Sequence, residues 1–194
     1  MGETCYSFVA QAGSEASGEI FIKAAKKEGI CVTVDYAPGK RTTKLLRSGK
    51  YVGEVGRIAS YKEIIGDKAF ILEPALASGE GVAISSTISE KSKLQNYSGQ
   101  VGICRGWKWM SELVAQNKMT NIFEAKDFDQ LINALNHRRI DLFFAPLPLI
   151  NFSKILVKYE VIPIYEIKVF VWLHHERKDL STKFSRVLES LYQK

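Results

Sequence analysis

The first part of the chain changes repeatedly between the two hydrophobic periods of strands and helices. The helical segment carries Ile20, Phe21, Ala24 and Ala25 on one face, follows a polar loop over residues 11–18 and stops at Gly29. The predicted elements are, in order, a strand over residues 4–10, this helix, a strand over 30–36, a helix over 38–49 and a strand over 52–57. The pattern is βαβαβ.

The same order of elements returns later in the chain. It predicts a strand over residues 101–104, a helix over 107–115, a strand over 121–124, a helix over 128–137 and a strand over 140–145. In the second of these helices, Phe128, Leu131 and Leu135 share an apolar face, and Asp127 precedes it as N-cap with Gln130 three residues on. The chain therefore contains two similar α/β halves.

The segments outside the halves predict extended connections. Residues 70–86 carry a strand-like apolar run, residues 167–173 alternate strictly, and the last helix places apolar residues at 184, 187, 188 and 191. Because each half is small for an independent core, we expect an α/β fold of two lobes joined by crossovers. The expected lobes are residues 1–80 with 167–194, and residues 81–166.

Composition narrows the class of protein. Of the 194 residues 46% are hydrophobic and 25% charged, as in soluble globular chains, and the apolar stretch 140–150 is too short to span a bilayer. The net charge of +6 is spread among acids, as in Lys26-Lys27-Glu28, so we expect no nucleic-acid partner. The N-terminus lacks a signal-peptide pattern, which indicates either a cytoplasmic protein or the removal of an export signal.

The cysteines and histidines indicate no metal site or cofactor. Cys5, Cys31 and Cys104 lie far apart, and three buried thiols are the favoured interpretation, with a Cys5–Cys31 disulfide as the alternative. His174 and His175 are adjacent on a predicted strand, so they point to opposite faces, and we expect one to be packed and one solvated.

Several short segments resemble one family when they are taken together in order. They are Gly39-Lys40-Arg41, Ser48-Gly49-Lys50, Val52 to Ile58, Glu73-Pro74, Leu94 to Ile103, Arg105-Gly106, Gln130 to Leu135 and Arg139-Ile140-Asp141. Their order and spacing resemble type 2 periplasmic solute-binding proteins of the amino-acid-binding class. The resemblance implies a hinged clamshell, a periplasmic location and a monomer that delivers a small ligand to an ABC transporter permease.

Two departures from the family pattern bear on the ligand. Pro146 stands where relatives that bind α-amino acids usually place an aspartate for the ligand ammonium, and Ser60-Tyr61-Lys62 stands near the usual Thr-x-x-Arg. The resemblance therefore implies a binding protein whose ligand is not an ordinary amino acid.

Candidate ligand-binding residues follow from the rule that parallel sheets bind ligands outside the carboxyl ends of their strands. We expect the ligand in the cleft between the lobes, with Arg57 holding a carboxylate; the alternative is a surface arginine paired with Glu54 or Glu63. The other candidates in the first lobe are Tyr36 and Arg41, although Arg41 could instead pair across the lobe.

In the second lobe the candidates are Gly106, Trp107 and Lys108, at a junction between strand and helix. The alternative for Trp107 is packing between helix and sheet.

No catalytic motif is present, so we expect a binding protein and not an enzyme. The alternatives are the ligand-sensing domain of a membrane receptor, or a small dehydratase-like enzyme on the same fold. For such an enzyme, Glu54 and Glu73 are the available acid–base residues.

Overall fold

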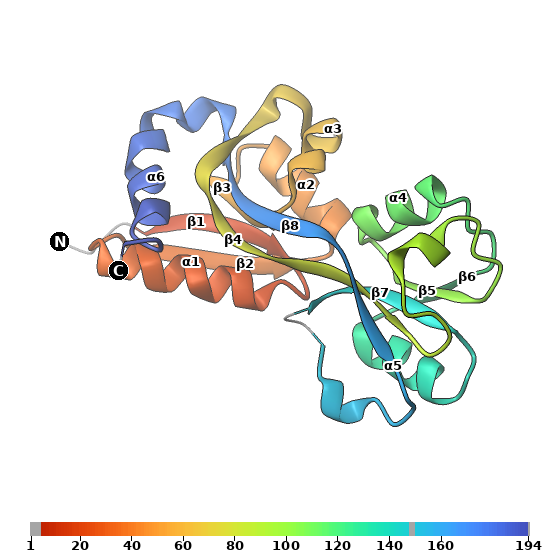
Figure 1. The fold of residues 1–194 in the computed structure, drawn as a ribbon. Helices are drawn as coiled ribbons and strands as arrows, with labels where there is room; N and C mark the ends of the chain where they lie inside the picture. Colours follow the sequence, from red (N-terminus) through yellow and green to blue (C-terminus); the bar gives the residue numbers. More distant parts are fainter. Residues whose placement is uncertain (1–4, 148–149, 194) are drawn as a thin grey trace. The chain divides into compact units, whose positions relative to one another are not determined.

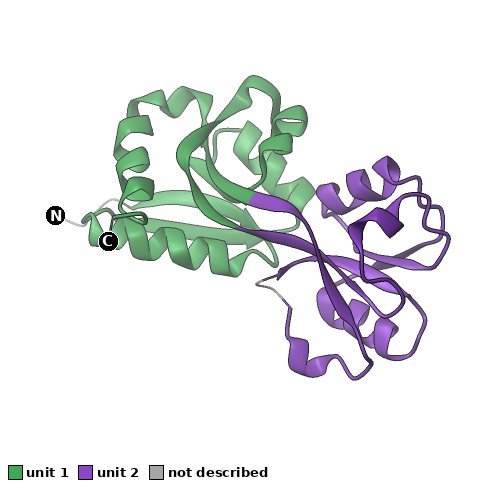
Figure 2. Ribbon diagram, viewed as in Figure 1, with its two compact units in different colours: residues 1–78, 168–194 green, residues 79–167 purple. Residues whose placement is uncertain are grey.

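Two long strands, β4 (Ala69–Ser85) and β8 (Glu160–His174), each belong to both of the chain's two units. The structure, a computed structural model, describes residues 5–147 and 150–193. Unit 1 contains residues 1–78 and 168–194, and unit 2 contains residues 79–167 (Figure 2). The chain thus passes between the units once in each long strand.

Unit 1 contains the first βαβαβ pattern and the C-terminal helix (Figure 1). Its elements are β1 (Tyr6–Gln11), α1 (Glu15–Lys27), β2 (Val32–Ala37), α2 (Gly39–Arg47), β3 (Gly53–Arg57), α3 (Lys62–Ile65) and α6 (Ser181–Glu189). Short 3-10 turns lie at Ala59–Tyr61, Gly66–Lys68 and His175–Leu180. Strand β1 pairs in parallel with β2 and β3, and β8 pairs antiparallel with β3.

Unit 2 repeats the pattern. Its elements are β5 (Val101–Cys104), α4 (Lys108–Gln116), β6 (Ile122–Ala125), α5 (Phe128–Asn136) and β7 (Leu142–Pro146), with 3-10 turns at Lys91–Leu94 and Phe152–Lys154. Strand β5 pairs in parallel with β6 and β7, and β4 pairs antiparallel with β7. The hydrogen-bonded strand order is β2-β1-β3-β8-β4-β7-β5-β6.

Three aromatic rings from distant parts of the sequence form the centre of the unit 1 core. Phe8 of β1 lies edge-on to Phe21 of α1 and to Phe184 of α6, at centroid distances of 4.9 and 5.0 Å. All three are fully buried. The apolar stripe predicted for the last helix therefore anchors the C-terminus of the chain to its N-terminal strand.

The start of α5 shows how local chemistry fixes an element boundary. The Asp127 carboxylate accepts a hydrogen bond from the Gln130 backbone N–H at 2.8 Å, which confirms the predicted N-cap. The Gln130 side chain accepts from the Lys126 N–H at 2.7 Å, one residue earlier than in a standard capping box.

The structure corrects three expectations. Helix α1 begins at Glu15, inside the predicted loop, because the turn after Gln11 needs only three residues. Residues 170–173 are all buried and do not alternate, because β8 packs on both of its faces there.

The favoured interpretation of three thiols is also wrong. Cys5 and Cys31 form a disulfide with their Cα atoms 4.6 Å apart, while Cys104 is a buried free thiol.

Among the described residues, no helix is long and apolar enough to cross a bilayer.

Candidate functional site

The carboxyl ends of three strands of unit 1 lie along one edge of the sheet. Because β1 is parallel to both β2 and β3, their last residues, Gln11, Ala37 and Arg57, come to the same edge. Open α/β sheets bind ligands at such edges, where loops lead into helix N-termini. The edge contains Arg57, the first of the predicted ligand-binding residues.

A β-bulge at Gly56 orients Arg57. Side chains three positions apart in a regular strand point to opposite faces, so Glu54 and Arg57 would normally be separated. The pairing of β3 with β8 shifts between Val55 and Arg57, and Gly56, the residue between them, has φ of +84°. The extra residue brings Glu54 and Arg57 to one face.

The Arg57 guanidinium is held by partners from three elements. Its Nε donates to Glu54 Oε1 at 2.6 Å, its Nη1 donates to Gln11 Oε1, and its Nη2 donates to Thr42 Oγ1 at 2.9 Å. Nη2 also donates to the Gly39 carbonyl at 3.2 Å. Four of the five guanidinium N–H groups therefore have partners within the described chain, and one Nη1 N–H has none there.

The counter-charge of Arg57 is a carboxylate that is removed from water. Glu54 is fully buried and also accepts from the Thr42 hydroxyl at 2.7 Å and the Tyr61 hydroxyl at 2.6 Å. Burial, together with the neighbouring Glu54 carboxylate, raises the pKa of Tyr61 well above its ordinary value, so its O–H remains a donor. The Arg57 guanidinium also lies over the Tyr61 ring at 4.7 Å from the centroid.

Gly39 allows this network to close. A Cβ at this position would lie 3.0 Å from Gln11 Oε1 and 3.3 Å from Arg57 Nη2. A side chain at position 39 would therefore press on both groups, and the glycine at the start of α2 lets the backbone carbonyl approach the guanidinium.

The structure bears on the predicted alternatives for Arg57. Its pairing with Glu54 is present, but the pair is buried and not on the surface, since the Arg57 side chain is only 15% exposed. To hold a ligand carboxylate with two N–H groups, Arg57 would have to give up one of its present hydrogen bonds. The bond from Nη1 to the uncharged Gln11 amide is the one next to the Nη1 N–H that has no partner in the described chain.

The other two candidates in unit 1 lie beside this network without joining it. Tyr36, near the end of β2, is 38% exposed, and its hydroxyl lies 3.4 Å from the Glu15 carbonyl at the start of α1. Arg41, in the first turn of α2, is exposed, and no ion pair joins it to an acid of the described chain.

The three candidates in unit 2 follow the carboxyl end of β5. Gly106 has φ of +85° and forms the turn that leads into α4. Trp107 precedes the first residue of α4, is half-buried, and contacts Phe128, the first residue of α5, at a ring distance of 5.2 Å. Lys108 forms an ion pair with Glu112 at 3.3 Å.

Sequence reasoning missed most of the partners of Arg57. The sequence pattern assigns Gln11 to a loop and Tyr61 only to a departure from the family motif, and it gives no signal for Thr42. The local signal that was available is Glu54-Val55-Gly56-Arg57, in which a glycine between opposite charges suggests a bulge that joins them.

Comparison with solved structures shows the fold. The GluR0 ligand-binding core in complex with L-glutamate superposes with a TM-score of 0.77 at 14% identity, over 98% of this chain and 93% of that chain. An ABC uptake transporter substrate-binding protein from Streptococcus pneumoniae with bound histidine gives 0.73 at 15% identity, over 96% and 87%. The chain therefore has the two-lobed fold of type II periplasmic binding proteins, as the resemblance implied.

A third structure and one sequence relative complete the comparison. The GluR0 ligand-binding core of Nostoc punctiforme with L-glutamate gives a TM-score of 0.74 at 10% identity, over 96% of this chain and 92% of that chain. An uncharacterized protein of Shewanella oneidensis is 29% identical over 132 residues, which cover 64% of this chain and 48% of that protein. The chain thus spans about half the length of that relative, and no family model matches the sequence.

Proposed function

We propose that this chain is a solute-binding module that holds the carboxylate of a small ligand at Arg57. The observation that carries the proposal is a guanidinium at the carboxyl edge of β1 and β3, preorganised by Glu54 and retaining one N–H for a further acceptor. Fixed donors of this kind orient an anionic group with little loss of entropy on binding. Tyr36, Arg41, Gly106, Trp107 and Lys108 remain the other proposed ligand contacts.

The ligand class follows from charge. Proteins of known structure with this fold include one in complex with L-glutamate and one with bound histidine, and both ligands carry a carboxylate. Pro146, at the end of β7, offers no side-chain oxygen to an ammonium group. We therefore propose a carboxylate without an α-ammonium group, such as a dicarboxylate or an aromatic acid, as the preferred ligand.

The proposed setting is extracytoplasmic, with delivery of the ligand to an ABC transporter by a monomer. The Cys5–Cys31 disulfide supports this location, because disulfides persist in oxidising compartments. A ligand-sensing domain of a membrane receptor is the second candidate, and binding of the same ligand would serve either role.

The positions of the two candidate acid–base residues, Glu54 and Glu73, favour a binding role over catalysis. Glu54 is fully buried and accepts hydrogen bonds from three side chains, so its carboxylate is not exposed to a ligand in this structure. Glu73 is exposed on β4. Neither carboxylate is placed as the acid or base that a dehydratase would need.

The test is calorimetric titration with a panel of dicarboxylates, aromatic acids and amino acids, first on the unmodified chain. Arg57→Lys keeps a cation beside Glu54 but lacks the planar fork, so we expect an affinity loss of roughly tenfold or more. Arg177→Lys, on an exposed turn of unit 1, is the matched control. Equal affinity of Arg57→Lys and the control would rule out Arg57 as the carboxylate contact.

Gln11→Ala refines the same test. If the ligand carboxylate replaces the Gln11 amide at Nη1, the variant should bind as tightly as the unmodified chain or a few-fold more tightly. A clear loss would show instead that Gln11 itself contacts the ligand.

A further inference from the structure

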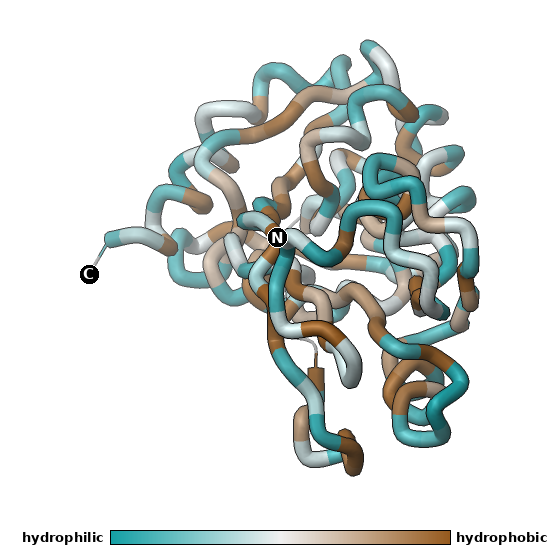
Figure 3. The backbone as a smooth tube through the Cα atoms, turned by 45° about the vertical axis from the view of Figure 1, so that its right-hand side comes forward, coloured by the Kyte–Doolittle hydropathy of each residue, from teal (hydrophilic) through white to brown (hydrophobic). Residues whose placement is uncertain are grey.

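A leucine of unit 2 is held almost entirely in water. Leu156 is 82% exposed, the highest value among the large apolar residues that the structure leaves exposed, and it lies in the loop over residues 150–160. In Figure 3 a short hydrophobic stretch stands at the turn of this loop. A single exposed leucine is ordinary, so its surroundings decide whether it has a role.

The loop holds Leu156 outward by specific contacts. The Asn136 side chain, at the end of α5, donates to the Lys154 carbonyl at 2.8 Å and accepts from the Leu156 N–H at 2.7 Å. At the base of the loop, the rings of Phe152 and Tyr159 stack at 5.7 Å. The backbone around Leu156 is therefore fixed on both sides, and its exposure follows from the fold of the loop.

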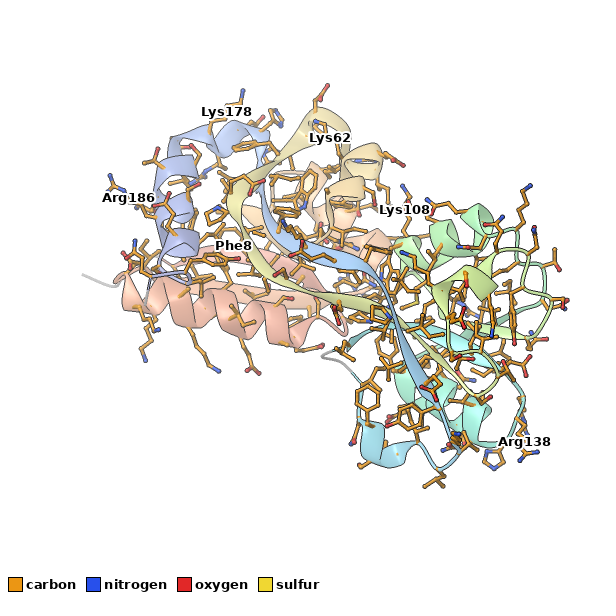
Figure 4. The ribbon with its side chains drawn as sticks, viewed as in Figure 1. Phe8, Lys62, Lys108, Arg138, Lys178 and Arg186 are labelled. Carbon is orange, nitrogen blue, oxygen red and sulfur yellow. A yellow bond between two sulfur atoms is a disulfide. The ribbon has the colours of Figure 1, made fainter. Side chains whose placement is uncertain are left out.

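Two arginines and a histidine adjoin the same anchor residue. His137, Arg138 and Arg139 follow Asn136 directly and are all exposed. Arg138 has φ of +54°, and Figure 4 shows its side chain directed away from the ribbon. No described acid forms an ion pair with these three side chains, whereas nearby Lys154 is neutralised by Asp129 at 2.7 Å.

The loop also borders a cavity that Leu156 does not line. A cavity of about 230 Å³ lies between residues 158–160 and residues 85–89. Its lining includes three serines, Thr87, Lys158 and Glu160, and is therefore mostly polar. Burying an apolar side chain in this cavity would desolvate hydroxyl and charged groups, so the cavity is not an apolar site for the loop.

We propose that the basic tip, defined as His137, Arg138, Arg139 and Leu156, docks on an anionic phospholipid surface. Arginines beside a membrane are attracted to lipid phosphates, and an exposed leucine gains free energy on entering the interface. A lipid surface satisfies both features without a shaped pocket, whereas an acidic protein partner would need a cavity that fits the leucine. The inference is independent of the Arg57 site.

The test uses the full chain and sedimentation with lipid vesicles at low salt, about 50 mM. We expect binding to vesicles with roughly one third phosphatidylglycerol, none to pure phosphatidylcholine, and release at about 500 mM salt. Arg138→Glu/Arg139→Glu should lower the binding at least about tenfold, and Leu156→Ser should lower it by roughly fivefold.

A charge-matched control isolates the basic tip. Lys178→Glu/Arg186→Glu makes the same change in net charge on exposed positions of unit 1, and should leave vesicle binding within about twofold of the unmodified chain. Equal losses in the two double variants would mean that binding follows net charge alone and would overturn the proposal. Absence of binding to anionic vesicles would also overturn it.

Discussion

At the scale of single residues, the most consequential feature is a buried ion pair that one glycine makes possible. Glu54 and Arg57 come from one strand, yet the bulge at Gly56 turns both to the same face, 2.6 Å apart. Burial makes such a pair a poor source of stability, because desolvation of both ions offsets their attraction. Its retention at the carboxyl edge of the sheet fits a role in fixing the guanidinium.

The first prediction concerns the energetic coupling of this pair. Glu54→Gln leaves Arg57 buried beside a neutral group and should lower the free energy of unfolding by about 3–5 kcal/mol. The double variant Glu54→Gln/Arg57→Leu should lose clearly less than the sum of the single changes, because no unpaired charge remains. Urea unfolding of the four proteins measures the coupling, and additive losses would contradict it.

At the scale of elements, the disulfide connects the beginnings of two paired strands. Cys5 immediately precedes β1, Cys31 immediately precedes β2, and the Tyr6 N–H donates to the Cys31 carbonyl at 2.9 Å. The bridge therefore closes the chain around α1. Its main effect is to restrict the unfolded chain, because the strands are already aligned by their own hydrogen bonds.

The second prediction concerns this bridge. Replacing Cys5 and Cys31 together by alanine should lower the free energy of unfolding by roughly 2–4 kcal/mol. The same loss should follow reduction of the unmodified chain, and the double variant should not respond to reductant. Urea unfolding with and without dithiothreitol measures both effects.

Thiol titration provides the control for the disulfide. Burial raises the pKa of the Cys104 thiol to about 12, so the folded chain should not react with an aromatic disulfide reagent at pH 8. In urea without reductant, Cys104 alone should react. Reaction of all three cysteines under these conditions would show that Cys5 and Cys31 are free.

The sequence predicts a helix or strand correctly where a local signal, such as hydrophobic periodicity or an N-cap, determines it. Asp127 caps α5, and Pro38-Gly39 introduces α2, as their spacing indicated. The alternation expected for residues 167–173 fails because that stretch of β8 is covered on both faces, which depends on elements distant in sequence. The cysteine spacing does not favour the disulfide, because its geometry depends on the parallel pairing of β1 with β2.

In the candidate site too, some residues can be predicted from the sequence and others cannot. Arg57 can be found because it ends a predicted strand, and Glu54 is one of the two acids that the sequence offers as its partner. Gln11, Thr42 and Tyr61 come from β1, α2 and the turn after β3, and only the sheet order brings them to one guanidinium. Sequence spacing alone contains no information on that convergence.

At the scale of the whole molecule, the two units differ in how the chain composes them. Unit 2 is a single segment, whereas unit 1 combines residues 1–78 with residues 168–194. The core of unit 1 needs both segments, since Phe8 and Phe21 pack on Phe184, and Tyr61 packs edge-on to Trp172 at 5.3 Å. Unit 1 can therefore complete its core only after the C-terminal segment is present.

The third prediction follows from this asymmetry. A chain that ends at residue 167 lacks Trp172, Phe184 and their buried neighbours, and the lost apolar contacts exceed the few kcal/mol by which a domain of this size is stable. We expect unit 1 of this fragment to be unfolded and unit 2 to remain folded. Limited proteolysis should then trim the fragment to a resistant core close to residues 79–167.

The matched control is a fragment of residues 79–167 alone, which should melt cooperatively at the temperature of the trimmed core. It retains β5, β6 and β7 with both covering helices, and also the parts of β4 and β8 that belong to unit 2. Complete digestion of both fragments would show instead that unit 2 depends on unit 1. In that case the two units would fold as one cooperative body despite their separate cores.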